Sequence, residues 1–135
     1  MNISEAARRS GLSSKTIRYY ESIGLIAPAA RADNGYRQYD AATLEELQFL
    51  QRAREVGFNL DESRQLLELL RDRQRHSVHA RDLVLEKSRQ LQDKIAALQS
   101  MQSVLNDMAR RCNGDEGPDC AILDDLAGVE VGIRG

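Results

Sequence analysis

The segment of residues 78–111 contains no Gly and no Pro, the two residues that most often interrupt a helix. It predicts one continuous helix, which at 1.5 Å per residue would be roughly 50 Å long. Apolar residues recur at every seventh position along it, namely Val84, Leu91, Leu98 and Leu105. A heptad stripe of this length predicts a coiled coil, because the apolar seam needs a facing helix that excludes water.

A second apolar line lies three positions after the first and is less regular. Met101 and Met108 continue it and Ile95 widens the stripe, whereas Lys87 and Lys94 occupy its first half and make the seam imperfect. The small N-terminal part of the chain cannot cover the whole stripe. We therefore expect a coiled coil, antiparallel or parallel, between two copies of the chain, with a helix folded back on its own chain as the alternative.

The N-terminal residues predict two short helices joined by a tight turn. Ser4 can cap the first helix, and Gly11 can end it. Ser13 can cap the second helix, which runs to Ser22 and stops at Gly24. Two short helices around a Gly-containing turn are typical of a helix-turn-helix unit.

Asn34-Gly35 is a strong hairpin signal, because both residues tolerate the positive φ of a type I′ turn. Tyr36 and Tyr39 flank it, and tyrosine is favoured in strands. The segment therefore predicts a small two-stranded wing that follows the helix-turn-helix.

Two further helices follow the wing. Asp40 can cap the first, which runs to about Val56, ends at Gly57 and places on one face Leu44, Leu47, Leu50 and Ala53. Asn59 and Glu62 form a capping-box pair at the start of the second, whose apolar surface consists of Leu66, Leu67, Leu69 and Leu70.

These elements predict a mainly helical chain with four parts. The parts are a winged helix-turn-helix domain with connecting helices (1–71), a polar connector (72–77), a dimerisation helix (78–111) and a C-terminal metal-binding loop and tail (112–135).

The net charge of −2 conceals an uneven distribution along the 135 residues. Residues 1–40 hold six basic and four acidic side chains, whereas residues 112–135 hold one basic and six acidic ones. The sequence pI of about 5.7 therefore does not exclude nucleic-acid binding by the N-terminal third. No apolar run is long enough for a transmembrane helix, and the N-terminus lacks the regions of an export signal, so we expect a cytoplasmic protein.

The second helix carries side chains expected of a DNA recognition helix. Lys15, Arg18 and Ser22 lie close to one face and could reach base edges or phosphates in the major groove. Further hydroxyl and guanidinium groups around it come from Tyr20, Tyr36, Arg37 and Arg54. Each could be an ordinary solvated side chain, and Tyr19 could be half in the core. As an ordered set with the helix-turn-helix and the wing, they favour DNA binding.

Cys112 and Cys120 are the only two cysteines, and a short segment rich in Gly, Pro and Asp separates them. Such a segment predicts a compact loop that can aim both sulfurs at one point. Two thiolates suit a soft cation such as Cu(I), whereas a structural Zn²⁺ site usually takes four ligands. A disulfide is the alternative, and the missing export signal argues against an oxidising compartment.

Three ordered blocks, residues 17–26, 34–39 and 54–60, resemble the MerR family of transcriptional regulators. The resemblance implies a winged-helix DNA-binding domain, an antiparallel coiled-coil dimer interface and a C-terminal effector site. RNA polymerase is a further partner that it implies. It also implies contacts with operator DNA from Lys15, Arg18, Tyr20, Arg31, Asn34, Tyr36, Arg37 and Arg54.

Within the family, the chain most resembles the CueR-type copper-efflux regulators, which share the Cys-x7-Cys loop, Gly114-Asp115 and Ile122-Leu123. By this resemblance, sensors of divalent ions carry a third cysteine at the position of Ser77, and sensors of monovalent ions carry serine. Linear coordination by two thiolates suits a monovalent d¹⁰ ion. The resemblance thus implies that Cys112 and Cys120 bind Cu(I), or Ag(I) or Au(I), with one ion per protomer.

Two thiolates and one monovalent cation leave one net negative charge that needs stabilisation. We expect a short helix of residues 121–127 to direct its N-terminus toward the site. Arg81, one turn beyond Ser77, could supply a cation to the site from the dimer-mate. His76 and His79 are alternative ligands that fit a thiolate site less well. The acidic residues of the loop, which are Asp115, Glu116 and Asp119, most simply keep it soluble.

These features predict a homodimeric regulator that activates copper-efflux genes. The resemblance implies that the metal-bound dimer kinks and untwists a promoter whose −35 and −10 elements are too far apart, and a few kcal/mol suffices for such deformation. The alternatives are a related regulator of silver, gold or thiol oxidation, and a DNA-independent cytosolic copper buffer. We do not expect an enzyme, because the sequence shows no nucleophile–base set and no phosphate loop.

Overall fold

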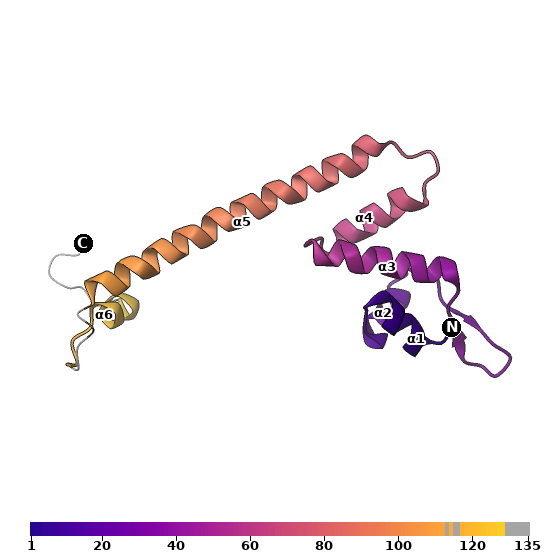
Figure 1. The fold of residues 1–135 in the computed structure, drawn as a ribbon, viewed down its shortest axis with the longest axis horizontal. Coiled ribbons are helices and arrows are strands. Elements are labelled where there is room, and N and C mark those ends of the chain that lie inside the picture. The colour runs from indigo at the N-terminus through magenta and orange to yellow at the C-terminus, as the bar shows by residue number, and fades with distance from the viewer. Residues whose placement is uncertain (113, 115–116, 129–135) are drawn as a thin grey trace. The chain divides into compact units, whose positions relative to one another are not determined.

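The computed structural model describes residues 1–112, 114 and 117–128. Its elements, in chain order, are α1 (Ile3–Ser10), α2 (Ser14–Ser22), β1 (Ala30–Arg31), β2 (Arg37–Gln38), α3 (Ala41–Glu55), α4 (Leu60–Arg71), α5 (Ser77–Arg111) and α6 (Ala121–Ala127), as Figure 1 shows. The chain divides into two compact units, residues 1–87 and the residues from 88 onward, and α5 continues from the first into the second. The predicted mainly helical fold is confirmed.

The helix-turn-helix forms from α1 and α2 as expected, with one correction at its start. Asn2, not Ser4, caps α1, because its Oδ1 accepts the backbone N–H of Glu5 at 2.9 Å and asparagine caps helices as well as serine does. Gly11 ends α1 with a φ of +80°. Ser13 caps α2 by accepting the backbone N–H of Thr16 at 3.0 Å, as predicted.

The wing is a hairpin of β1 and β2, with Arg31 opposite Arg37, but its turn is not of type I′. Gly35 adopts a φ of +84°, whereas Asn34 stays at negative φ. The reason is local: Asn34 Oδ1 accepts the backbone N–H of Tyr36 at 3.0 Å, and Gly35 N–H donates to the carbonyl of Ala32 at 2.9 Å. The turn therefore needs one left-handed residue instead of two.

The core of the first unit lies where α3 packs against α1 and α4, and α2 contributes Ile17 and Tyr20 to it (Figure 1). Asp40 and Asn59 cap α3 and α4 as predicted, and Glu62 completes the capping box. Leu67 of α4 is fully buried, while Leu70 on the predicted apolar face is exposed. The predicted inward face of α3 is buried in full, with Leu44, Leu47, Leu50 and Ala53.

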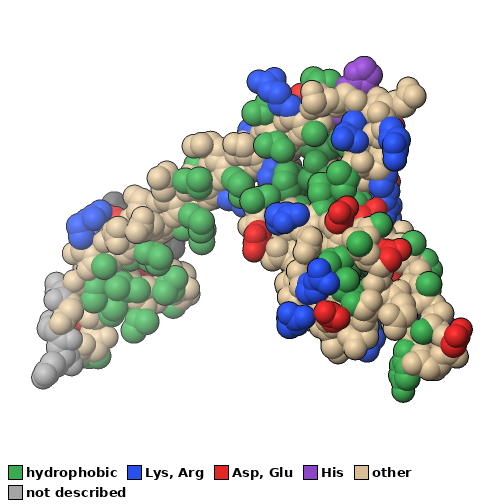
Figure 2. Space-filling view, turned by 45° about the vertical axis from the view of Figure 1, so that its right-hand side comes forward, with side chains coloured by type: hydrophobic (Ala, Val, Ile, Leu, Met, Phe, Trp, Pro, Cys, Tyr) green, Lys and Arg blue, Asp and Glu red, His purple; other side chains and the backbone are tan. Residues whose placement is uncertain are grey.

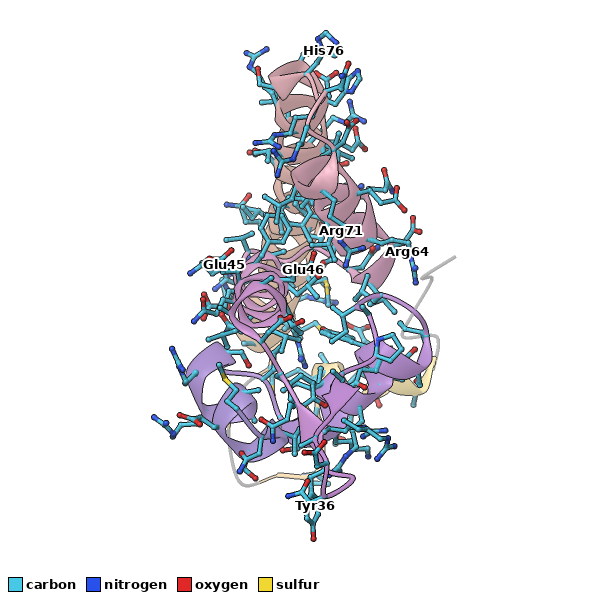
Figure 3. All side chains as sticks on the ribbon, turned by 90° about the vertical axis from the view of Figure 1, so that its right-hand side faces the viewer. Tyr36, Glu45, Glu46, Arg64, Arg71 and His76 are labelled. Atoms are coloured by element: carbon cyan, nitrogen blue, oxygen red, sulfur yellow. The ribbon has the colours of Figure 1, made fainter. Side chains whose placement is uncertain are left out.

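The end of α4 is fastened to the rest of the first unit by Arg71, as Figure 3 shows. Its guanidinium donates to both carboxylate oxygens of Glu46, at 2.7 and 2.8 Å, and to the carbonyl of Leu25 at 3.1 Å. A bidentate pair of this kind fixes geometry as well as distance. Arg71 therefore ties α4 both to α3 and to the segment after α2.

The long helix α5 begins at Ser77, one residue before the predicted start, and ends at Arg111 as predicted. None of the described helices is long and apolar enough to cross a membrane. Lys87 does not lie in an apolar seam, because its side chain is buried against Glu62 of α4. The predicted heptad stripe is exposed to solvent in the single chain, at Val84, Leu91, Leu98 and Leu105.

Candidate nucleic-acid interface and thiolate site

A hollow of about 500 Å³ lies between α2, the wing and the start of α1. Tyr36, 71% exposed, projects from the wing (Figure 3). Guanidinium, amide and hydroxyl groups gathered at one hollow could donate to the phosphates of a nucleic-acid backbone. The hollow brings together five of the predicted DNA-contacting residues, which are Arg18, Arg31, Asn34, Tyr36 and Arg37.

Two other predicted residues lie near the start of α2. Lys15 is exposed on its first turn. Arg54, near the end of α3, borders hollows that Thr16 and Ser13 of the helix-turn-helix also line. Cationic side chains thus lie both beside the wing and near the N-terminal end of α2.

One of the two tyrosines of α2 is less exposed than a DNA contact requires. Tyr20, predicted to contact DNA, is 8% exposed and belongs to the hydrophobic core. Tyr19, which could be half in the core, is 51% exposed and so agrees with that reading. Residues three apart lie on one face of a helix, so Tyr20 lies on the same inward face of α2 as Ile17. Tyr19 is therefore the side chain more accessible to a partner.

Glu21 joins α2 to the wing, a role that the sequence analysis missed. It accepts a hydrogen bond from the Tyr39 hydroxyl, and Arg37 Nε lies 3.8 Å from its Oε2. The backbone N–H of Ala29 donates to the same oxygen at 3.4 Å. Burial, and then the bond to Glu21, raises the pKa of Tyr39 to about 12. One signal of this role was available in the sequence: Glu21 is acidic, whereas the other charged residues of α2, Lys15 and Arg18, are basic.

The two cysteines are brought together as predicted. Their Sγ atoms lie 3.4 Å apart, well beyond a covalent S–S bond of about 2.05 Å, and both are free thiols. Cys112 directly follows α5, and Cys120 occupies the N-cap position of α6. Hydrogen bonding by the backbone N–H of Leu123, and then the contact with Cys112, lowers the pKa of the Cys120 thiol. Thiolate is the form that binds metal.

Contacts outside the thiols close the loop. Arg111 Nη2 lies 2.7 Å from Oδ2 of Asp125, and Arg111 Nε lies 3.2 Å from Oδ2 of Asp107. Hydrophobic side chains also gather where α6 meets the last turns of α5 (Figure 2), with Leu126 beside Met108 at the same hollow. Sequence patterns gave no signal for the Arg111–Asp125 pair.

The other residues that the sequence predicted near the metal site lie in the first unit. Ser77 and Arg81 are exposed and belong to the first unit, whereas the cysteines belong to the second, so their approach stays a prediction. His76 and His79 are also in the first unit, with ring centroids 5.9 Å apart. Among the residues that the structure describes, no group of three or more His, Cys, Asp or Glu side chains is placed to hold a metal. Asp115 and Glu116 lie outside the described residues, as does the tail from Val129.

Comparison with known proteins gives a consistent result. Residues 1–70 match the family described as MerR HTH family regulatory protein, and residues 44–108 match the one described as MerR, DNA binding. An uncharacterized HTH-type transcriptional regulator of Pseudomonas aeruginosa is 49% identical over 94% of this chain and 96% of its own. The HTH-type transcriptional regulator CueR of Salmonella typhi is 47% identical over 95% and 93%. The crystal structure of the transcription regulator PbrR691 from Ralstonia metallidurans, in complex with lead(II), superposes with a TM-score of 0.81 at 32% identity, covering 93% of this chain and 98% of that one.

Proposed function

The chain belongs to the MerR family of helix-turn-helix regulatory proteins, and on that premise we propose that it is a homodimeric, Cu(I)-responsive transcriptional activator. The observation that carries the proposal is that one chain contains two features: free thiols 3.4 Å apart in its second unit, and a hollow lined by guanidinium groups in the helix-turn-helix of its first unit. The proposal places the protein in the cytoplasm, where promoter DNA is accessible.

The thiol pair supports a soft metal effector. Cys112 and Cys120 supply two sulfur ligands, and the backbone N–H groups at the start of α6 favour the charged form of Cys120. Softness of the ligands favours Cu(I) over harder ions. One relative is named CueR, the name of the copper-efflux regulators that this sequence resembles. The structural neighbour PbrR691, in contrast, was crystallised with lead(II).

Discrimination among ions is assigned to Ser77. A hydroxyl in place of a third thiol leaves the site with two sulfur donors, too few for the usual tetrahedral site of a divalent ion. Arg81, one turn later on α5, would offset the remaining negative charge if the partner protomer brings it near the loop. Both assignments require the homodimer that the exposed heptad stripe favours.

Activation is proposed to act through DNA shape. Each protomer would place α2 in the major groove and the wing against the phosphates, using Lys15, Arg18, Arg31 and Tyr36. In the metal-bound dimer the two DNA-binding units would kink and untwist the spacer, so that RNA polymerase engages both promoter elements. A coupling of about 1–3 kcal/mol between the two sites is enough for such a switch.

A mobility-shift assay tests the DNA-binding part. Fragments of genomic DNA are incubated with the protein at low and at moderate salt, with and without Cu(I), and their mobility is compared with that of the free fragments. A specific, salt-sensitive shift is expected both with and without the metal. No shift at low salt would reject the regulator in favour of a copper buffer.

The thiol spacing favours one rival, a regulator that responds to thiol oxidation. Two sulfurs 3.4 Å apart need only a small approach to form a disulfide. A transcription assay in which peroxide, Cu(I), Ag(I), Au(I), Hg(II) and Zn(II) are each added separately distinguishes the two regulators. Activation by peroxide alone would support the oxidation sensor, and strong activation by Zn(II) without Cu(I) would reject the role given to Ser77.

A further inference from the structure

Lys87 is the last residue of the first unit, and its side chain is buried although it carries a charge. It is 6% exposed, with Nζ lying 2.8 Å from Oε1 of Glu62 and 5.9 Å from the centroid of the Phe58 ring. Lysine is almost never fully buried without a partner. The contact therefore joins the first three turns of α5 to the first turn of α4.

Glu62 serves two helices with one carboxylate oxygen. Its Oε1, which pairs with Lys87, also accepts the backbone N–H of Asn59 at 2.8 Å and so caps α4. Phe58 comes just before this cap and borders the hollow shared with Tyr19 and Arg54. Lys87 thus reaches from α5 to the segment between α3 and α4, which also borders the proposed recognition helix.

The pair selects one register of α5 on α4. A shift by one residue would bring either Glu86, a like charge, or the uncharged Ser88 opposite Glu62. Buried ionic groups are best known for specifying register in this way, even where they add little stability. Beyond Lys87, α5 continues into the unit that holds both cysteines.

We propose that Lys87 is a positioning residue that couples the effector unit to the DNA-binding unit. The proposal rests on the proposed function, because it assumes an effector signal that travels along α5. Lys87 is the last residue of that helix that belongs to the DNA-binding unit. Without the Lys87–Glu62 pair, α5 stays covalently attached but its register on α4 is no longer fixed.

Three single variants of the full chain separate coupling from structure. Lys87→Met removes the charge and keeps a long apolar side chain beside Phe58, and Lys87→Arg keeps the charge. Arg89→Met is the matched control, because it also replaces a cation by methionine, at an exposed position on the side of α5 away from the heptad stripe. Each protein is assayed for operator affinity without metal, for Cu(I) affinity by chelator competition, and for the activation ratio in transcription in vitro.

Lys87→Met is expected to lower the activation ratio about tenfold, with operator and Cu(I) affinities within about twofold of the wild type, since allosteric couplings commonly span 5–150-fold. Lys87→Arg should restore most of the ratio, and Arg89→Met should match the wild type. An unchanged ratio in Lys87→Met overturns the proposal. So does an operator affinity that falls as far as the ratio does, because that result identifies a structural role.

Failure of the proposed function would be seen separately, as a wild type that no metal activates. Amide hydrogen exchange on the metal-free proteins then tests the Lys87–Glu62 contact by itself. Lys87→Met should accelerate exchange in the first turns of α4 and in residues 77–87, relative to Arg89→Met. Equal exchange in the two variants overturns the role of Lys87.

Discussion

Arg111 and Asp125 form an ion pair, with 2.7 Å between Nη2 and Oδ2, that joins the end of α5 to α6. The two residues flank the segment that holds both cysteines, so the pair closes the loop at its base. A ligand loop that is closed before the metal arrives loses less conformational entropy on binding. The pair therefore joins the two helices that flank the cysteines without involving either thiol.

Arg111→Ala should lower the affinity for Cu(I) by up to about fivefold, because a partly exposed ion pair contributes at most about 1 kcal/mol. Arg110→Ala is the matched control, since the partner of Arg110 among the described residues is Asp107 of α5 itself, at 3.4 Å. Competition with a chromophoric Cu(I) chelator gives both affinities. An equal loss in the two variants would mean that net charge, and not loop closure, sets the affinity.

Replacement of either thiol, by Cys112→Ser or Cys120→Ser, should abolish metal-dependent activation. A hydroxyl is a hard, neutral donor and cannot replace a thiolate toward a soft ion. Operator affinity of the metal-free protein should stay within about twofold, since the loop and the basic hollow belong to different units. Loss of operator binding in either variant would show that the loop is structural instead of sensory.

Arg18→Ala should weaken operator binding across all sequences and reduce the slope of log K against log salt by about 1, as expected for one lost phosphate contact. Arg8→Ala is the control, because Arg8 is exposed on α1, pairs with Glu5 and does not line the hollow. Fluorescence anisotropy at several salt concentrations measures both slopes. Equal slopes for the two variants would remove Arg18 from the interface.

Alkaline pH should loosen the wing through Tyr39. Its pKa is about 12 in the folded chain against 10.0 for the ordinary side chain, so the unfolded chain loses the proton first. The stabilisation is complete below pH 10 and is lost as the pH rises toward 12, at a cost of up to roughly 2–3 kcal/mol. Urea unfolding at fixed protein concentration should show a steeper loss for the wild type than for Tyr39→Phe. Parallel curves would contradict the shift.

Local signals predicted the elements of the first unit well. The caps Ser13, Asp40 and Asn59 mark helix starts because each side chain satisfies backbone N–H groups within its own turn. The α3 face is buried as its periodicity predicted. Ser4 failed as a cap because Asn2, an equally good capping residue, lies two positions earlier.

Features that depend on contacts between elements could not be predicted. Periodicity placed Lys87 on a seam, yet tertiary packing pairs it with Glu62, twenty-five positions earlier in the chain. The exposures of Tyr19 and Tyr20 depend on which side of α2 faces the core. The sequence does not indicate that orientation, because the two tyrosines are adjacent and equally apolar. The spacing of the cysteines predicted their meeting, whereas the Arg111–Asp125 pair has no local signature.

Transcription in vitro from an operator that the protein itself selects tests the proposed function most directly. Wild-type protein and RNA polymerase are titrated with Cu(I) and, in parallel, with Zn(II), and Cys112→Ser serves as the inactive control. Transcript should rise with Cu(I) to saturation at one ion per protomer, and neither Zn(II) nor the variant should raise it. Equal transcript with and without Cu(I), from an operator that the protein occupies in both cases, would contradict a copper-responsive activator.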